Sequence, residues 1–157
     1  MNLSEELLAL DVDRAIVEIR EALSTQVLRT LQRRGLVVGL SGGVDSSVVA
    51  ALGVAALGPD RVLGLLMPER ATSSDSTRLA ELLAAQLGIR TVVEDLGPAL
   101  ESIGCYARQE EAIRAVFPEY GEGWKCKVSL PPLLEGERFN LTRLTVRSPS
   151  GEERSSR

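Results

Sequence analysis

Short apolar runs alternate with helix-length segments downstream of residue 35, and this alternation strongly constrains the fold. The runs over residues 36–40, 61–66 and 89–93 are rich in Leu, Val and Ile, which is typical of buried strands. The segments between them, about 45–57 and 74–87, have the length and apolar spacing of helices. Strands that alternate with helices form βαβ units with parallel strands and right-handed crossovers. We therefore predict an α/β fold, an open parallel sheet with flanking helices.

The two ends of the chain give weaker signals. Upstream, apolar residues recur at helical spacing over residues 11–34, and Gly35 is a stop signal, so a helix is predicted there. After Gly97 glycine and proline are frequent, and we expect an irregular region or a small β-hairpin. The elements expected there are a helix over 106–117, a loop over 121–136, an imperfect strand over 138–147, a turn over 148–151, and a tail over 152–157 that is either a returning hairpin arm or disordered.

Composition narrows the possible partners and chemistry. The 157 residues carry a net charge of −4, so nucleic acid is not an expected partner. No apolar run approaches the roughly 20 residues that span a bilayer, and the acidic N-terminus does not resemble a signal peptide. Cys105 and Cys126 have neither zinc-site nor disulfide-framework spacing, which makes a cytoplasmic protein the simple interpretation. The chain has no histidine, so its chemistry must use hydroxyls, carboxylates, cations, backbone dipoles or a bound metal.

The loop between the first predicted strand and the following helix has the features of a phosphate-binding site. The strand ends at Leu40, at the carboxyl edge of the sheet, where open α/β folds bind ligands. Gly42 and Gly43 permit positive φ angles and close approach of backbone N–H groups to phosphate oxygens. The N-terminus of the next helix adds unpaired N–H groups and partial positive charge. Ser41 and Ser46 add hydroxyl donors.

Asp45 is the informative residue of this loop. A carboxylate beside a phosphate is repulsive unless a cation lies between them, and Mg²⁺ held by one or two carboxylates and by phosphates resolves the conflict. The alternative is a plain glycine turn before a helix that Asp45 or Ser46 caps. The full string from Ser41 to Ser46 favours phosphate binding over that alternative. The Walker and Rossmann patterns are both absent.

The string Ser41-Gly42-Gly43-Val44-Asp45-Ser46-Ser47 resembles the motif of the N-type ATP pyrophosphatases, or PP-loop proteins. Within that superfamily, the segment from Gly64 to Asp75, with Met67-Pro68 and Ser73-Ser74, looks like NAD synthetase. GMP synthetase resembles the loop equally well but typically has a different segment there. The resemblance covers about residues 11–103 and then fades.

The resemblance implies ATP and Mg²⁺ as ligands. It implies that the loop holds the phosphates, that Asp45 holds the metal, and that Leu65 and Met67 border the adenine. The residues expected to bind ATP are Gly39, Leu40, Ser41, Gly42, Gly43, Val44, Asp45, Ser46, Leu65 and Met67. No residue is expected to act as a covalent or acid–base catalyst.

The reaction implied is that of NAD synthetase, a ligase. ATP adenylylates the carboxylate of deamido-NAD, and ammonia then displaces AMP to give NAD. Another PP-loop enzyme, of the GMP synthetase or tRNA-thiolation type, and an ATP-binding remnant without catalysis are the alternatives.

The resemblance also bears on the organisation of the chain. We divide it into an ATP-pyrophosphatase-type nucleotide-binding domain over residues 1–103 and a region of uncertain role over 104–157. Family members are longer, so the chain is expected to be a truncated member. They are homodimers. No glutaminase segment is found before the loop, so ammonia would come from solution or from another chain, and the nitrogen donor, ammonia or glutamine, stays open.

Overall fold

The computed structural model describes residues 9–129 and 142–156. The chain divides into two compact units, residues 1–97 and 98–157. Among the described residues, no helix is both long and apolar enough to cross a membrane. Each unit has its own sheet and its own core, so the two are described separately.

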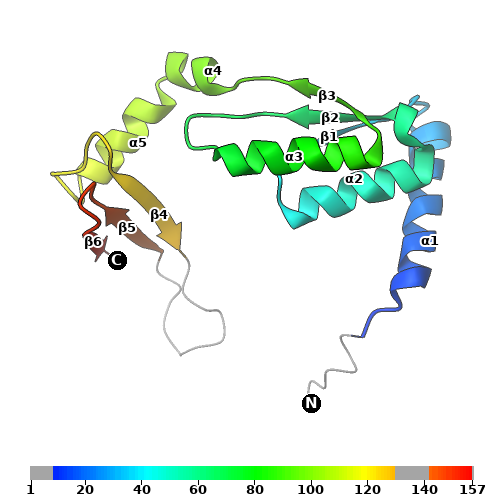
Figure 1. The fold of residues 1–157 in the computed structure, drawn as a ribbon, viewed down its shortest axis with the longest axis horizontal. Coiled ribbons are helices and arrows are strands. Elements are labelled where there is room, and N and C mark those ends of the chain that lie inside the picture. Colours follow the sequence, from blue (N-terminus) through cyan, green and yellow to red (C-terminus); the bar gives the residue numbers. More distant parts are fainter. Residues whose placement is uncertain (1–8, 130–141, 157) are drawn as a thin grey trace. The chain divides into compact units, whose positions relative to one another are not determined.

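The first unit is built on a three-stranded parallel sheet. Its strands are β1 (Leu36–Gly39), β2 (Val62–Leu66) and β3 (Arg90–Val93), in the order β1-β2-β3 (Figure 1). Leu36 lies opposite Val62, and Leu63 lies opposite Arg90. The predicted α/β class is therefore confirmed, and the predicted strands agree with the observed ones to within one residue at each end.

Two helices connect these strands and lie on one side of the sheet (Figure 1). They are α2 (Val44–Leu57) and α3 (Ser74–Leu87), and a short 3₁₀ turn, η3 (Pro59–Arg61), leads from α2 into β2. Ser73 caps α3, since its hydroxyl accepts a hydrogen bond from the Ser76 amide, and Gly88 ends α3 in the left-handed conformation. The buried core between helices and sheet consists of Val38, Leu40, Ala50, Val62, Leu66, Ala80, Ala84 and Ile89.

The other face of the parallel sheet carries apolar side chains that stay accessible. Residues paired in register share a face, so Val37 lies with Leu63, and Leu65 lies with Val92. Val37 is 64% exposed and Val92 is 45% exposed, whereas Val62 on the helix side is 3% exposed. The burial of this sheet is therefore strongly one-sided in the described residues.

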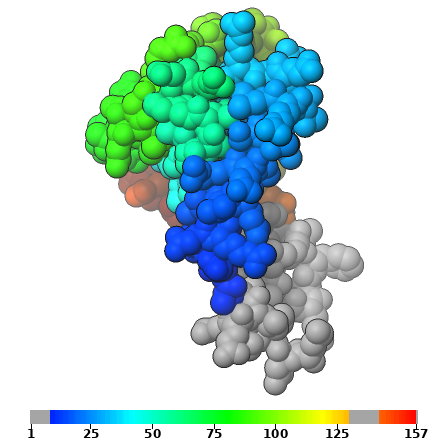
Figure 2. All heavy atoms as spheres, turned by 90° about the vertical axis from the view of Figure 1, so that its right-hand side faces the viewer, coloured from blue at the N-terminus to red at the C-terminus, as the bar shows by residue number. Residues whose placement is uncertain are grey.

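The helix predicted over residues 11–34 is shorter and changes its hydrogen-bonding pattern. It consists of α1 (Val12–Ser24), which Asp11 caps through the Arg14 amide, and the π-helical segment η2 (Thr25–Thr30). Gln32 has a positive φ of 51°, so the chain leaves the helix before Gly35, and the predicted C-terminus was wrong. The side chains of α1 lie on the surface of the unit, shown in blue in Figure 2.

The second unit combines helices with an antiparallel sheet. Its elements are α4 (Gly97–Ser102), α5 (Cys105–Arg114), β4 (Lys125–Ser129), β5 (Arg143–Arg147) and β6 (Glu153–Ser156). The strand order is β4-β5-β6 (Figure 1). Ile113, Phe117 and Val146 form the core, and Tyr120, Trp124, Cys126 and Leu144 pack against it. Burial raises the pKa of the Tyr120 phenol to about 12, and Cys126 beside it contributes.

Sequence reasoning was least accurate in this unit. The segment predicted as a loop contains β4. Its side chains alternate as in a strand: Cys126 faces the core, whereas Lys125 and Lys127 face away from it. Helix α4 was not expected. Of the predicted strand over 138–147, the part at 143–147 is confirmed, whereas residues 130–141 lie outside the described part. The tail pairs with β5 as β6, so the hairpin alternative is confirmed, and the amide of Gly151 donates to the Ser148 carbonyl in the predicted turn.

The one-sided burial of the parallel sheet predicts different effects for the same substitution on its two faces. Val62→Ala should lower the free energy of unfolding by about 2–3 kcal/mol, because two buried methyl groups are lost and a cavity remains. Val37→Ala, the matched control on the open face, should change it by less than about 0.5 kcal/mol. Urea unfolding of both variants checks this, and equal losses would contradict the assignment of the faces.

Candidate functional site

The loop of residues 40–43 connects the carboxyl end of β1 to α2. Pairing with β2 extends one residue beyond the strand, because the Leu40 amide donates to the Leu65 carbonyl at 2.8 Å. The chain then turns at Gly42, whose φ is +78°, a conformation that side chains disfavour. Gly43 follows in extended conformation as the N-cap of α2. The predicted strand–loop–helix arrangement is therefore present at the sheet edge.

Serine hydroxyls fix the shape of this loop. The Ser41 hydroxyl accepts a hydrogen bond from the Gly43 amide at 3.3 Å and lies 3.1 Å from the Ser46 hydroxyl. Ser46 accepts from the Ser41 amide at 3.3 Å and is placed to donate to the Gly43 carbonyl at 3.1 Å. The Ser47 hydroxyl donates to the same carbonyl at 2.8 Å. These bonds tie the loop to the first turn of α2.

The N-terminus of α2 is suited to an anion. Its N-cap is Gly43, which makes no side-chain hydrogen bond to the helix, so the alternative in which Asp45 or Ser46 caps this helix is wrong. The first N–H groups of a helix have no partner within it, and they carry partial positive charge. A glycine N-cap leaves them without a side-chain acceptor. Phosphate oxygens are the kind of acceptor that such a terminus binds.

Asp45 lies in the first turn of α2 and is exposed. Within the described part of the chain it takes part in no hydrogen bond or ion pair, and no group of three or more potential metal ligands occurs. A single carboxylate beside phosphate-binding amides fits Mg²⁺, which keeps several waters and takes oxygens from substrate phosphates. The residues present therefore fit a metal held jointly by Asp45 and a polyphosphate.

The first turn of α3 packs directly on the glycine loop. A Cβ atom placed on Gly42 would lie 2.3 Å from the carbonyl oxygen of Ser76, so only glycine fits at this contact. The Ser76 amide donates to the Ser73 hydroxyl at 3.1 Å, and the two hydroxyls lie 2.8 Å apart. The loop that follows β1 and the helix that follows β2 therefore form one packed unit.

A cleft of about 370 Å³ opens beside this contact. Its apolar wall comes from Leu40, Leu66, Met67 and Pro68, and Ser41, Thr72, Ser73, Ser76 and Thr77 add hydroxyl groups. Glu69 and Ala71 complete the lining. The combination of apolar surface with hydroxyl donors suits a nucleoside, which has a flat ring and a polar sugar.

The structure distributes the predicted site residues over two places. Leu40, Ser41 and Met67 line the cleft, and Gly42 to Ser46 form the adjoining loop and the first turn of α2. Leu65 lies on the other face of the sheet, opposite Gly39, and the Cε atom of Met67 packs over Gly39. Ser76 and Thr77 were not predicted, although a run of hydroxyl residues in a first helical turn was a usable signal.

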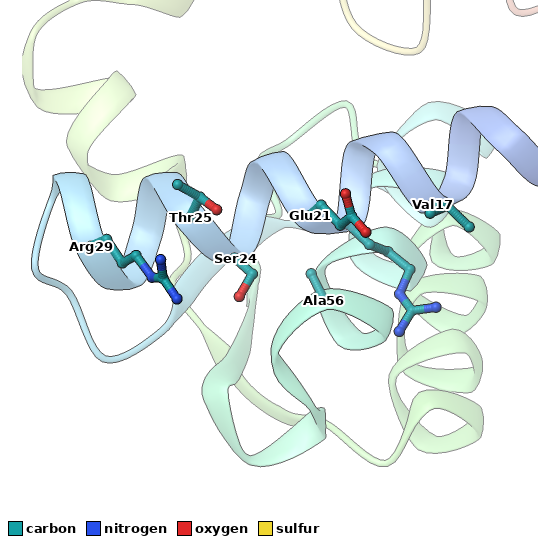
Figure 3. Close-up of a pocket in the computed structure, with 7 residues that line it drawn as sticks. Val17, Glu21, Ser24, Thr25, Arg29 and Ala56 are labelled. Carbon is teal, nitrogen blue, oxygen red and sulfur yellow. The ribbon is translucent and has the colours of Figure 1, made fainter.

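A second cavity, of about 480 Å³, lies along α1 and η2 and has a different character (Figure 3). Its residues include Glu21, Ser24, Thr25 and Arg29, and Ala56 of α2 lies across from them (Figure 3). Arg20 also lines it and donates to the Ala55 carbonyl at 2.9 Å. Residue 59, the helical partner of that carbonyl, is a proline without an N–H group, so Arg20 supplies the missing donor. We therefore place the candidate site at the glycine loop rather than here.

A parallel sheet with a glycine loop and an uncapped helix N-terminus at its carboxyl edge is typical of α/β nucleotide-binding proteins. The sequence profile of NAD synthase matches residues 15–117. The chain belongs to the NAD synthase family. The antiparallel sheet β4-β5-β6 lies outside the matched residues.

Individual relatives agree with this assignment. The chain is 58% identical over 146 residues to the NH(3)-dependent NAD(+) synthetase of Mesorhizobium japonicum, covering 93% of this chain and 46% of the relative. It is 43% identical to that of Rhizobium meliloti, covering 92% and 42%. The solved NH3-dependent NAD synthetase from Campylobacter jejuni matches with a TM-score of 0.58 at 25% identity, over 70% of this chain and 50% of that one. The chain spans about half the length of these relatives.

The contact between Gly42 and Ser76 predicts a large difference between two neighbouring glycines. Gly42→Ala should destabilise the first unit by roughly 1–3 kcal/mol or more, because it combines a positive φ with a backbone clash. Gly43→Ala should change stability by less than about 1 kcal/mol, because its φ is −88° and its Cβ meets only the Ser41 side chain. Guanidinium unfolding measures both, and similar values would show that the loop is not packed in this way.

Proposed function

We propose that this chain is the ATP-binding part of an ammonia-dependent NAD synthetase. In this reaction the carboxylate of deamido-NAD attacks the α-phosphate of ATP, pyrophosphate leaves, and ammonia displaces AMP from the acyl-adenylate to give NAD. The proposal rests on the loop of residues 40–43, whose amides and uncapped helix N-terminus suit a polyphosphate. The names of the relatives supply ammonia as the nitrogen donor and NAD as the product.

In this proposal, different residues of the site bind different parts of ATP. The segment from Gly39 to Ser46 holds the phosphates through its amides and hydroxyls, and Met67, which lines the cleft, borders the adenine. Leu65 lies on the other face of the sheet and is left out of this assignment. Asp45 holds Mg²⁺, which neutralises charge on the phosphates when bound. Ser76 and Thr77 extend the hydroxyl lining of the cleft, and the carbonyl group of Ser76 packs against Gly42 of the loop.

Catalysis in this proposal needs no nucleophile from the protein. The substrate carboxylate is itself the nucleophile, and pyrophosphate is the leaving group, so the chain has to align the two and stabilise developing negative charge. Backbone amides perform that task without a change in protonation. This agrees with a sequence that has no histidine.

A second candidate function is ATP binding without turnover. The chain spans about half the length of its relatives, and no group of three or more potential metal ligands occurs among the described residues, which leaves Asp45 as the one carboxylate of the loop. The family match favours NAD synthetase over the GMP synthetase and tRNA-thiolation alternatives. A cytoplasmic location and a homodimer belong to the proposal as well.

The two candidates differ in one measurable reaction. If the chain catalyses adenylylation, pyrophosphate should be released from Mg-ATP only when deamido-NAD is present, and NAD should form when ammonia is added. A coupled phosphate assay and chromatography of the products measure both. If ATP binds but no pyrophosphate is released at any deamido-NAD concentration, catalysis by this chain is excluded and ATP binding without turnover is supported.

Asp45→Asn should weaken the binding of Mg-ATP by about tenfold or more, because it removes the one anionic metal ligand of the loop. Asp60→Asn is the control, since Asp60 is exposed in η3 and lies outside the loop. Isothermal titration calorimetry with Mg-ATP measures both affinities. An Asp45→Asn variant that binds as tightly as the parent would remove Asp45 from the metal site.

A further inference from the structure

The antiparallel sheet of the second unit gathers cations on one face. Cys126, Leu144 and Val146 face the core with α5, so the alternate residues of the same strands face outward. The register places Lys125 opposite Arg147 and Lys127 opposite Thr145 on this outer face, and Arg143 occupies the next position of that face on β5. Thr145 itself is buried, at 6% exposure, and its hydroxyl lies 2.8 Å from that of Ser155. The outer cationic face is defined by Lys125, Lys127, Arg143 and Arg147, all of them exposed.

One pair on this face is unfavourable for the fold. Lys125 and Arg147 are directly opposite each other, where Cβ atoms lie about 4.5–5.5 Å apart and like charges destabilise a sheet. Lysines on an edge strand such as β4 have a protective role against edge-to-edge pairing. That role does not extend to Arg143 and Arg147, because β5 is the central strand. The positive charge therefore needs another explanation.

Carboxylates of the described residues offset the charge of this face only in part. Among the described residues of the second unit, ion pairs join Arg114 to Glu110, and Arg154 to Glu119 and Glu152. None of them includes a residue of the outer cationic face. Glu153, opposite Arg147 on β6, is the one acidic residue in register with it. In a chain whose net charge is −4, this concentration of positive charge is local.

We propose that the outer cationic face binds the polyphosphate group of a small, nucleotide-sized ligand. Arginine offers planar donors that match phosphate oxygens in pairs, and lysine adds mobile point charges. An anion between Lys125 and Arg147 turns their repulsion into two favourable contacts. This site is separate in sequence from the glycine loop and lies outside the residues matched by the family profile.

The size and composition of the face indicate a small ligand. Arg143 and Arg147 are about 13 Å apart along β5, at roughly 3.3 Å per residue, so the face offers contacts to only a few phosphates. Nucleic-acid sites typically make more phosphate contacts, or stack bases on aromatic side chains. The outward positions of the three strands hold Lys, Arg, Ser, Thr and Glu, and none of them is aromatic.

The test is a titration of the ¹⁵N-labelled full chain with sodium tripolyphosphate at low ionic strength, followed by amide chemical shifts. We expect saturable shifts at Lys125, Thr145 and Arg147. Arg147→Gln and Lys125→Gln should each weaken this binding by about tenfold, while Arg90→Gln, an exposed arginine of β3, should not change it. Lys125→Gln should leave the melting temperature of the chain unchanged or raise it, because it removes one of two like charges. A weaker binding by this variant then cannot be the result of unfolding.

Other outcomes overturn the proposal. These are the absence of shifts at the three amides, equal affinity in all three variants, or tighter binding of an oligothymidylate than of tripolyphosphate, which would make the face a nucleic-acid surface. ATP titrated in the same way distinguishes a nucleotide from free polyphosphate as the ligand. Shifts at Gly42 and Gly43 report on the glycine loop separately, so failure of the proposed function and failure of the sheet site can be told apart.

Discussion

The candidate site depends on one backbone contact, in which Gly42 packs against the carbonyl group of Ser76. A side chain at Gly42 would overlap that oxygen, and the positive φ of the residue is unfavourable for any other amino acid. The contact joins the loop after β1 to the helix after β2. Because parallel strands end at the same edge of the sheet, two segments that are distant in sequence meet there and form both the loop and the wall of the cleft.

The chain presents positive potential to anions in two physically different ways. At the glycine loop the charge is partial and comes from oriented amides, whose positions the hydroxyls of Ser41 and Ser46 fix. On the outer cationic face it comes from full charges on flexible side chains. Amides in a fixed arrangement favour precise alignment of phosphates, as an adenylyl transfer requires, whereas flexible cations favour binding with less geometric selectivity.

Local sequence signals predicted the first unit well and the second unit poorly. The strands of the first unit are mostly apolar and are separated by helices of 14 residues, so the apolar period and the segment length indicate the same elements. In the second unit β4 has the sequence Lys-Cys-Lys-Val-Ser and follows a glycine-rich segment. It has few apolar positions, so its sequence alone indicates a loop, and its pairing with β5 makes it a strand. The π-helical segment at Thr25 was also not predictable, because apolar spacing does not distinguish an α-turn from a π-turn.

The sequence by itself determined the alternation of strands and helices, the glycine loop at the end of the first strand, and the family to which these motifs point. These features depend on residues close together in the chain, where backbone preference and apolar period act directly. The tertiary structure decided that Ser76 supports the loop, that Leu65 and the cleft lie on different faces of the sheet, and that Lys125 opposes Arg147. Each of these depends on strand register or on helix packing between distant segments, which local preferences do not specify.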